Sequence, residues 1–247
     1  MLIVLPPSET KAEGGRGAAL DLDQLSLPTL TPIRRKLADA LVTLAADSEA
    51  SQQALGLGVS QIAEIERNAQ LWSSPTRPAI ERYTGVLFDA LDHSTLTRAS
   101  KTKASERLAV GSALFGVVRA TDPIPAYRLS SGSKLPGMGT LASVWKPALT
   151  DALTALGEDV VIDLRSGGYQ QLGPLPGAIT VTVLTEGPTG ARTVVSHFNK
   201  HHKGILARSL VSSRRQIRDV NSLAATATAG GQRAEVASDH ELIILTD

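Results

Sequence analysis

The spacing of hydrophobic and polar positions changes several times along the chain, from short apolar runs to helical periodicity and back. The short apolar runs predict strands at Leu2–Leu5, Leu108–Val118, Val160–Leu164, Ile179–Leu184, Arg192–His197 and Leu242–Leu245. Helical spacing predicts helices over Leu30–Ala46, Ile80–Leu91, Leu141–Leu156 and Lys200–Val220. Strands interleaved with helices predict one α/β (α+β) domain, residues 1–247, with a mixed sheet and flanking helices.

Residues from about 30 to 92 have mainly helical periodicity and are expected to form a lobe that packs on the sheet. Within this lobe, Leu55-Gly56-Leu57-Gly58-Val59 separates two helical stretches. Glycines permit a tight turn, and N–H groups at the start of the next helix can hold a DNA phosphate. The segment therefore resembles the hairpin of a helix–hairpin–helix element, with Gly56 and Gly58 as candidate DNA-binding residues. A plain helix–turn–helix with glycine C-caps has the same letters.

Composition removes several classes of chemistry. The 247 residues include no cysteine, which excludes disulfides, thiol nucleophiles and Cys-ligated metals. The first residues lack the basic start and the apolar length of a signal peptide, and no apolar run reaches the roughly 18 residues that a membrane helix needs. We expect a cytoplasmic protein that does not enter the membrane and that needs no metal or cofactor.

Charge is distributed unevenly although the formal net charge is only +1. Seven of the 25 basic residues lie between Glu186 and Asp219, where no acidic residue occurs, so the rest of the chain is acidic overall. On a continuous helix of 3.6 residues per turn, six of these cations fall on one side and apolar residues on the other. The six cations on one side are the candidate phosphate ligands, Lys200, Lys203, Arg208, Arg214, Arg215 and Arg218.

A helix with one cationic face favours a polyanion, because several guanidinium groups can make bidentate bonds to phosphate oxygens. We therefore predict a polyanionic partner. Two other interpretations of the charges stay open. The face can be a solvated surface with ion pairs to distant acids, or it can dock an acidic protein.

Polar residues near the predicted strand ends support a different hypothesis, an enzyme that acts on a nucleotide or another phosphorylated small molecule. Catalytic groups often follow a strand, as Ser8, Glu9 and Lys11 do here. The other candidate catalytic residues are Tyr127, Arg128, Ser166 and Tyr169. Candidate anion ligands in the same cleft are Arg119, Arg128 and Lys134. The residues alone leave open whether the protein is an enzyme.

Two further motifs carry little weight. Gly137-Met138-Gly139-Thr140-Leu141-Ala142 fits the dinucleotide pattern G-x-G-x-x-A, but the required strand does not precede it. His197 and His201 have the spacing of a metal pair on a helix, but neighbouring lysines repel a cation and a strand–helix boundary is expected between them.

Several segments, in order along nearly the whole chain, resemble the motifs of one known family. The opening Leu2–Lys11 and Tyr83-Thr84-Gly85 resemble family motifs, and Leu114–Leu129 resembles Y-G-V-L-R-P-x-D followed by P-Y-R-L. Val161–Tyr169 resembles a strand that ends in N-L-A-S, and Ser196–Arg208 resembles the basic block A-K-K-A-R-G-L-M-x-R. By these segments the chain resembles the YaaA family of bacterial peroxide-stress proteins. It departs from the family's motifs at Asp163 and Arg165, which replace Asn and Ala, at Gly168, which replaces an acid, and at His201 and His202 in the basic block.

The resemblance implies a compact α/β fold with a positive cleft and a helix–hairpin–helix element that binds double-stranded DNA. It places that element at Gly56 and Gly58. With this resemblance, we expect the polyanionic partner to be double-stranded DNA, bound without sequence specificity. It also implies a role in limiting hydrogen-peroxide damage, associated with keeping unincorporated intracellular iron low.

Overall fold

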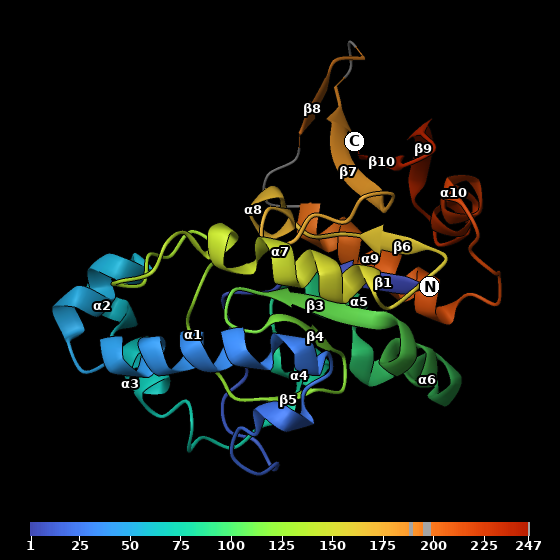
Figure 1. Cartoon of the computed structure of the whole chain (residues 1–247). Helices are drawn as coiled ribbons and strands as arrows, with labels where there is room; N and C mark the ends of the chain where they lie inside the picture. Colours follow the sequence, from blue (N-terminus) through green and yellow to red (C-terminus); the bar gives the residue numbers. More distant parts are fainter. Residues whose placement is uncertain (188–189, 195–198, 247) are drawn as a thin grey trace.

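A computed structural model describes residues 1–187, 190–194 and 199–246 (Figure 1). The large sheet has the strand order β4-β3-β1-β6-β7-β10-β9, and β8 pairs with β7. The eight strands of this sheet in the described ranges are β1 Leu2–Leu5, β3 Leu108–Ser112, β4 Gly116–Arg119, β6 Val161–Asp163, β7 Ile179–Glu186, β8 Arg192–Val194, β9 Arg233–Ser238 and β10 Glu241–Thr246. A separate two-stranded sheet pairs β2 Arg77–Pro78 with β5 Pro123–Ile124.

The centre of the large sheet is parallel and its edges are antiparallel. β1 pairs in parallel with β3 and β6, β7 pairs in parallel with β6 and β10, and the edge strands β4 and β9 run antiparallel to their neighbours. All four residues of β1 have no exposed surface, as expected for a central parallel strand covered on both faces. The predicted α/β fold with a mixed sheet is therefore confirmed.

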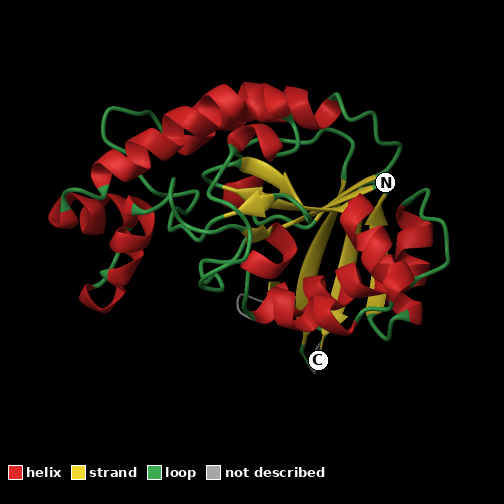
Figure 2. Ribbon diagram, turned by 90° about the horizontal axis from the view of Figure 1, so that it is seen from below, coloured by secondary structure: helices red, strands yellow, loops and turns green. Residues whose placement is uncertain are grey.

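Helices cover both faces of this sheet (Figure 2). Helix α9 packs against α5, α6 and α10. Helix α7 packs against β4. The helices of the described chain are α1 Thr31–Leu44, α2 Ser48–Leu55, α3 Ala63–Ala69, α4 Ala79–Arg82, α5 Val86–Leu91, α6 Arg98–Arg107, α7 Leu141–Thr154, α8 Gly167–Gln170, α9 Asn199–Ser212 and α10 Val220–Ala229. Short 3₁₀ turns lie at Leu22–Gln24, Pro28–Leu30, Val59–Gln61 and His93–Thr95.

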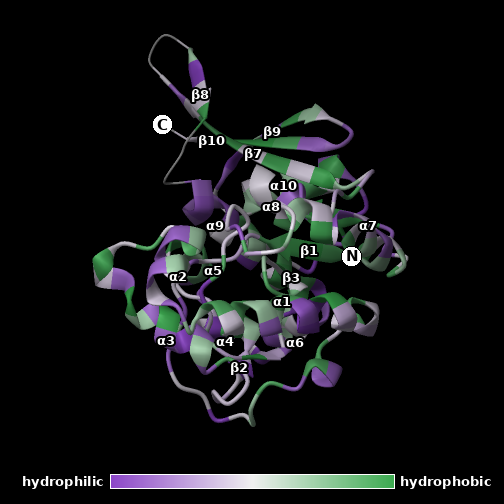
Figure 3. Ribbon diagram, turned by 60° about the vertical axis from the view of Figure 1, so that its left-hand side comes forward, coloured by the Kyte–Doolittle hydropathy of each residue, from purple (hydrophilic) through white to green (hydrophobic). Residues whose placement is uncertain are grey.

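One hydrophobic core joins the sheet to the helical segment that precedes it. The buried cluster includes β1 and extends to Leu37 of α1, Leu55 of α2 and Ile65 of α3. Figure 3 shows hydrophobic residues along the central strands and hydrophilic ones on outer surfaces. A buried arginine adds a polar link, because the Arg34 side chain donates to Phe115 O at 3.0 Å and to Val117 O at 2.9 Å.

Close packing of α9 on α5 requires a glycine. A Cβ added at Gly204 would lie 2.3 Å from Leu87 O and 2.8 Å from Ala90 Cβ. Only a residue without a side chain lets the two backbones approach this closely. Gly204 therefore determines how near the cationic helix lies to the rest of the molecule.

Several predicted elements have different bounds in the structure. The predicted strand Leu108–Val118 is two antiparallel strands, β3 and β4. The predicted helix Ile80–Leu91 is two short helices, α4 and α5, because Tyr83 has extended backbone angles and Gly85 has φ +96°. The strand expected at Arg192–His197 is observed as β8, Arg192–Val194, and its last three residues lie outside the described ranges.

The predicted helix Lys200–Val220 is wrong in extent, since α9 ends at Ser212 and α10 begins at Val220. The intervening turn is held by local hydrogen bonds. Arg215 N donates to Ser213 Oγ at 2.9 Å, and Asp219 caps α10 by accepting from Ser222 N at 2.7 Å. Serine and aspartate side chains compete with helical hydrogen bonds in this way. The six cations therefore do not share one helix face.

Candidate functional site

A buried lysine lies just beyond the carboxyl end of β1. Lys11 is 9% exposed, and its Nζ donates to Ser8 O at 3.1 Å and to Glu9 O at 3.3 Å. The same ammonium lies 4.3 Å from the centre of the Tyr127 ring and 5.3 Å from that of Tyr83. Burial lowers the pKa of Lys11 to about 7, with Glu64 opposing the shift and Arg128 and Arg67 adding to it.

Three hydroxyl groups form a chain beside this lysine. The Tyr83 and Tyr127 hydroxyls are 2.8 Å apart, and the Tyr127 hydroxyl is 2.7 Å from Ser112 Oγ at the end of β3. Ser112 Oγ also accepts from Phe115 N at 2.9 Å. Burial raises the pKa of both tyrosines, so their hydroxyls stay protonated at neutral pH.

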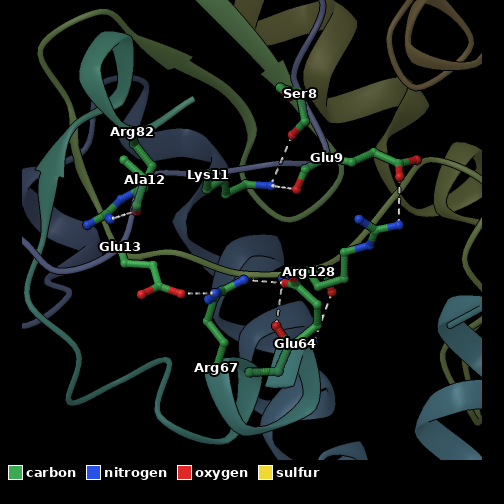
Figure 4. A network of polar contacts seen from close by, with 10 residues as sticks. Ser8, Glu9, Lys11, Ala12, Glu13, Glu64, Arg67, Arg82 and Arg128 are labelled. Atoms are coloured by element: carbon green, nitrogen blue, oxygen red, sulfur yellow. Dashed lines mark hydrogen bonds and ion pairs between the residues drawn. The ribbon is translucent and has the colours of Figure 1, made fainter. Parts of the chain in front are cut away.

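Ion pairs lie next to the lysine (Figure 4). Arg128 pairs with Glu9 at 2.6 Å, and Arg67 pairs with Glu64 at 2.6 Å and with Glu13 at 2.8 Å. A buried amide positions one of these groups. Asn68 on α3 donates to Arg128 O at 2.9 Å and accepts from Arg128 N at 2.8 Å. The helical segment thus contributes directly to the cluster at the sheet edge.

The structure brings most of the predicted catalytic residues together. Ser8, Glu9, Lys11, Tyr127 and Arg128 belong to one cluster. Tyr169 lies close enough for its pKa, raised mainly by burial, to be affected also by Tyr127, Glu9 and Arg128. Ser166 lines a neighbouring cavity instead. With a pKa of about 7, Lys11 is present in both protonation states near neutral pH, so its amine form can accept a proton or act as a nucleophile and its ammonium form can donate a proton.

The three predicted anion ligands do not converge. Arg119 pairs in register with Ala109 near the start of β3 and lies 3.8 Å from Glu158, at the sheet edge opposite to Lys11. Arg128 lies at the Lys11 edge in an ion pair with Glu9. Lys134 is exposed in a loop whose backbone N–H donates to Ala54 O. A cleft formed by Arg119, Arg128 and Lys134 together is therefore not present.

Sequence reasoning missed the partners that complete the Lys11 cluster, namely Ser112, Tyr83, Asn68, Glu64 and Arg67. Ser112 lies inside the single strand predicted at Leu108–Val118, so no pattern indicated that it would end β3 at the same sheet edge as Ser8. Tyr83 belongs to the Tyr83-Thr84-Gly85 motif, and an isolated bridge joins it to Lys11. No local pattern indicated the residues from α3, because only tertiary packing brings that helix here.

Two of the predicted phosphate ligands are engaged inside the molecule. Lys203 is 7% exposed, and its Nζ donates to Leu164 O at 3.0 Å. Arg208 donates to Leu91 O and Asp92 O, both at 2.8 Å, and to Thr95 Oγ1 at 2.9 Å. Arg208 thus satisfies carbonyl groups at the end of α5. Neither residue stands on an exposed ridge.

The other cations are solvent-exposed but lie at opposite ends of α9. Lys200 is in the first turn, whereas Arg214, Arg215 and Arg218 follow the helix. Lys103 of α6 donates to Ser213 O at 2.6 Å, which fixes the arginine segment against α6. We call these three arginines, together with the half-buried Lys103 and Arg107 of α6, the arginine rim.

The double-glycine turn is far from the arginine rim, since α2 and α3 lie at the left of Figure 1 and α6 and α10 at the right. Gly56 caps α2 with φ +64°, and Gly58 precedes the 3₁₀ turn of Val59–Gln61. The Gly58 N–H donates to Gln61 Oε1 at 3.1 Å. A helix–turn–helix is present here, and its DNA contact stays a prediction.

The described residues contain no group of three or more His, Asp or Glu side chains arranged to hold a metal ion. His197, one member of the His197–His201 pair, lies outside the described ranges. None of the described helices has the length and apolarity that crossing a bilayer requires.

Comparison with known proteins adds a family likeness over most of the chain. The family model described as "Peroxide stress protein YaaA" matches residues 1–234. A UPF0246 protein of Corynebacterium efficiens is 50% identical over 240 residues, which are 96% of this chain and 95% of the relative. UPF0246 proteins of Corynebacterium glutamicum and Streptomyces coelicolor are 48% and 46% identical, over 98% and 86% of this chain and 97% and 84% of the relatives.

Proposed function

Because the chain belongs to the YaaA family of peroxide stress proteins, we propose that it acts in this response by binding double-stranded DNA without sequence specificity. The observation that carries the proposal is the arginine rim. Arg214, Arg215 and Arg218 are exposed, and within the described ranges none of them lies within 4.0 Å of a carboxylate oxygen.

The rim suits a phosphate backbone because two chain segments add their charges on one surface. Lys103 and Arg107 stand one turn apart on α6, and the hydrogen bond from Lys103 to Ser213 joins that helix to the arginine segment. Guanidinium groups bind phosphate oxygens bidentately, and contacts to phosphate do not depend on the base sequence. Binding through this surface should therefore be strongly weakened by salt.

DNA binding of this kind also supplies a physical route to limiting iron-linked damage. A duplex concentrates cations along its phosphates, and basic side chains that neutralise phosphates release those cations. Ferrous ions held by DNA are among the cations released. The protein would thereby lower the amount of iron that meets peroxide at the DNA surface.

Charge reversal at three positions tests the proposal. Duplex binding by fluorescence anisotropy at low salt should weaken by at least about a hundredfold in the variant R214E/R215E/R218E. The matched control R16E/R35E/K36E makes the same charge change at exposed residues elsewhere and should keep most of the affinity. Equal loss in both variants, or no loss in the first, contradicts the assignment of the rim. Duplex cleavage by iron and peroxide should decrease when the native chain is bound and should not decrease with R214E/R215E/R218E.

A second candidate function is an enzyme acting on a nucleotide or another phosphorylated small molecule. The observation that favours it is Lys11, a buried amine with a pKa of about 7 beside the hydroxyls of Tyr127, Tyr83 and Ser112. Perturbed groups of this kind concentrate at functional sites. A thermal-shift screen of nucleotides first identifies a ligand that stabilises the native chain. Turnover of this ligand by the native chain, and its loss in Lys11→Met, support this function. If that variant turns the ligand over at the native rate, Lys11 has no catalytic role.

A further inference from the structure

A cavity of about 390 Å³ opens beside the first turn of α9. Its walls come from the residues that follow β1 and β6, from the start of β7 and from α9. The volume is within the range of about 300–1,000 Å³ that small-molecule sites usually have. No residue of the cluster around Lys11 lines it.

The described lining of this cavity is cationic. It includes Lys200, Lys203 and Arg165 and no aspartate or glutamate. Arg165 is neutralised from behind by Asp163, with hydrogen bonds of 2.8 Å to both carboxylate oxygens. The two ammonium groups therefore dominate the charge inside. An anion that enters the cavity meets two positive side chains within one helical turn.

Polar groups in the lining have unused hydrogen-bonding capacity. Lys203 is almost fully buried, and among the described residues its three N–H donors have one acceptor, Leu164 O at 3.0 Å. The Ser166 side chain makes no capping bond to α8. Asn199 Oδ1 is buried without a partner in the described part of the chain. Leaving the buried N–H donors of Lys203 unpaired is costly, and a ligand rich in acceptors would satisfy them.

The location agrees with a general rule for open parallel sheets. The chain leaves β1 towards β3 on one side, and β6 lies on the other side of β1. Ligands of such sheets bind outside the carboxyl ends of the strands, at the point where the strand order reverses. Pro6 after β1 and Leu164–Gly167 after β6 both line the cavity. The cavity is therefore at the crevice between β1 and β6.

We propose that this cavity binds the phosphate group of a small phosphorylated molecule, with Lys200, Lys203 and Ser166 as its ligands. The inference goes beyond DNA binding, because a cavity of this size does not admit a duplex and the arginine rim is at the other end of α9. A helix of 14 residues separates the two sites by roughly 21 Å. The proposed phosphate site does not depend on catalysis at Lys11.

Calorimetric titration of the full chain tests the site with inorganic phosphate, ribose 5-phosphate and ribose as probes. We expect the two phosphates to bind and ribose not to bind. Tighter binding of ribose 5-phosphate identifies a phosphate ester as the ligand, whereas equal affinities identify free phosphate. Absence of binding by both phosphates at 20 °C and low salt, up to about a hundred times the protein concentration, overturns the proposal.

Variants assign the binding to the cavity. Lys200→Met and Ser166→Ala change exposed residues, so both variants should fold, and each should weaken phosphate binding about tenfold or more. Lys146→Met, an exposed lysine on α7, should bind as the native chain does. Unchanged affinity in both lining variants contradicts the site. R214E/R215E/R218E should retain phosphate binding while losing DNA, which separates failure of this site from failure of the DNA proposal.

Discussion

The ammonium group of Lys11 lies 4.3 Å from the centre of the Tyr127 ring, whose hydroxyl is 2.7 Å from Ser112 Oγ. The lysine follows β1, the tyrosine follows β5, and the serine ends β3. Three segments distant in sequence thus meet at one edge of the parallel sheet. Burial of this contact is the main cause of the low pKa of Lys11.

Lys11 should make stability rise with pH above neutrality. Its pKa is about 7 in the folded chain against 10.5 for a fully solvated lysine, so between these values the unfolded chain binds more protons. The free energy of unfolding therefore gains from this residue as pH rises from about 7 to 9.5. We expect the free energy of unfolding of Lys11→Met minus that of the native chain, measured in urea at pH 7, 8.5 and 9.5, to decrease as pH rises. A constant difference contradicts the low pKa.

Removing the Tyr127 hydroxyl should destabilise the fold more than removing the Tyr83 hydroxyl. Tyr127→Phe loses hydrogen bonds to both Ser112 and Tyr83, whereas Tyr83→Phe loses one. A buried hydrogen bond of this type contributes about 1 kcal/mol, and an orphaned buried partner adds to the loss. Chemical denaturation of the two variants measures the order. The reverse order contradicts the hydroxyl chain.

Gly204→Ala should lower the free energy of unfolding by about 2 kcal/mol or more, because the added Cβ would lie 2.3 Å from Leu87 O. The control is Gly132→Ala, where a Cβ meets no atom within 4 Å and the residue is exposed. That substitution should change the free energy of unfolding by less than about 0.5 kcal/mol. Similar effects at both positions are inconsistent with the close packing of α9 on α5.

Arg208→Met should lower stability and leave DNA affinity nearly unchanged. The arginine donates to Leu91 O, Asp92 O and Thr95 Oγ1, and its loss removes the donor to Leu91 O, while Asp92 O keeps the Thr95 N–H. We expect a loss of about 1–3 kcal/mol in thermal or urea unfolding. A folded variant that instead loses DNA affinity as R214E/R215E/R218E does would place Arg208 on the binding surface.

The elements that could be predicted from sequence are those with one unambiguous pattern. The apolar run Leu2–Leu5 is a strand, and the periodic stretches become α1 and α7 with nearly the predicted bounds. The error at residues 200–220 has a physical cause. Helical spacing of cations continues past Ser212, but serine side chains and the Asp219 cap end one helix and begin another. Periodicity alone does not detect such a break.

The candidate sites were predictable only in part for a similar reason. Ser8, Glu9 and Lys11 follow the first strand, so their place at the sheet edge was expected from sequence. Asn68 and Arg67 reach the cluster through the packing of α3, and the burial of Lys203 results from the approach of α9 to the end of β6. Neither fact is encoded in local spacing.

The salt dependence of duplex binding tests the central proposal most directly. The slope of log affinity against log salt should be steep for the native chain and should fall by about 3 in R214Q/R215Q/R218Q, close to one unit for each lost phosphate contact. The same slope in both proteins, or a native affinity that does not change with salt, contradicts the assignment of the arginine rim as the DNA-binding surface.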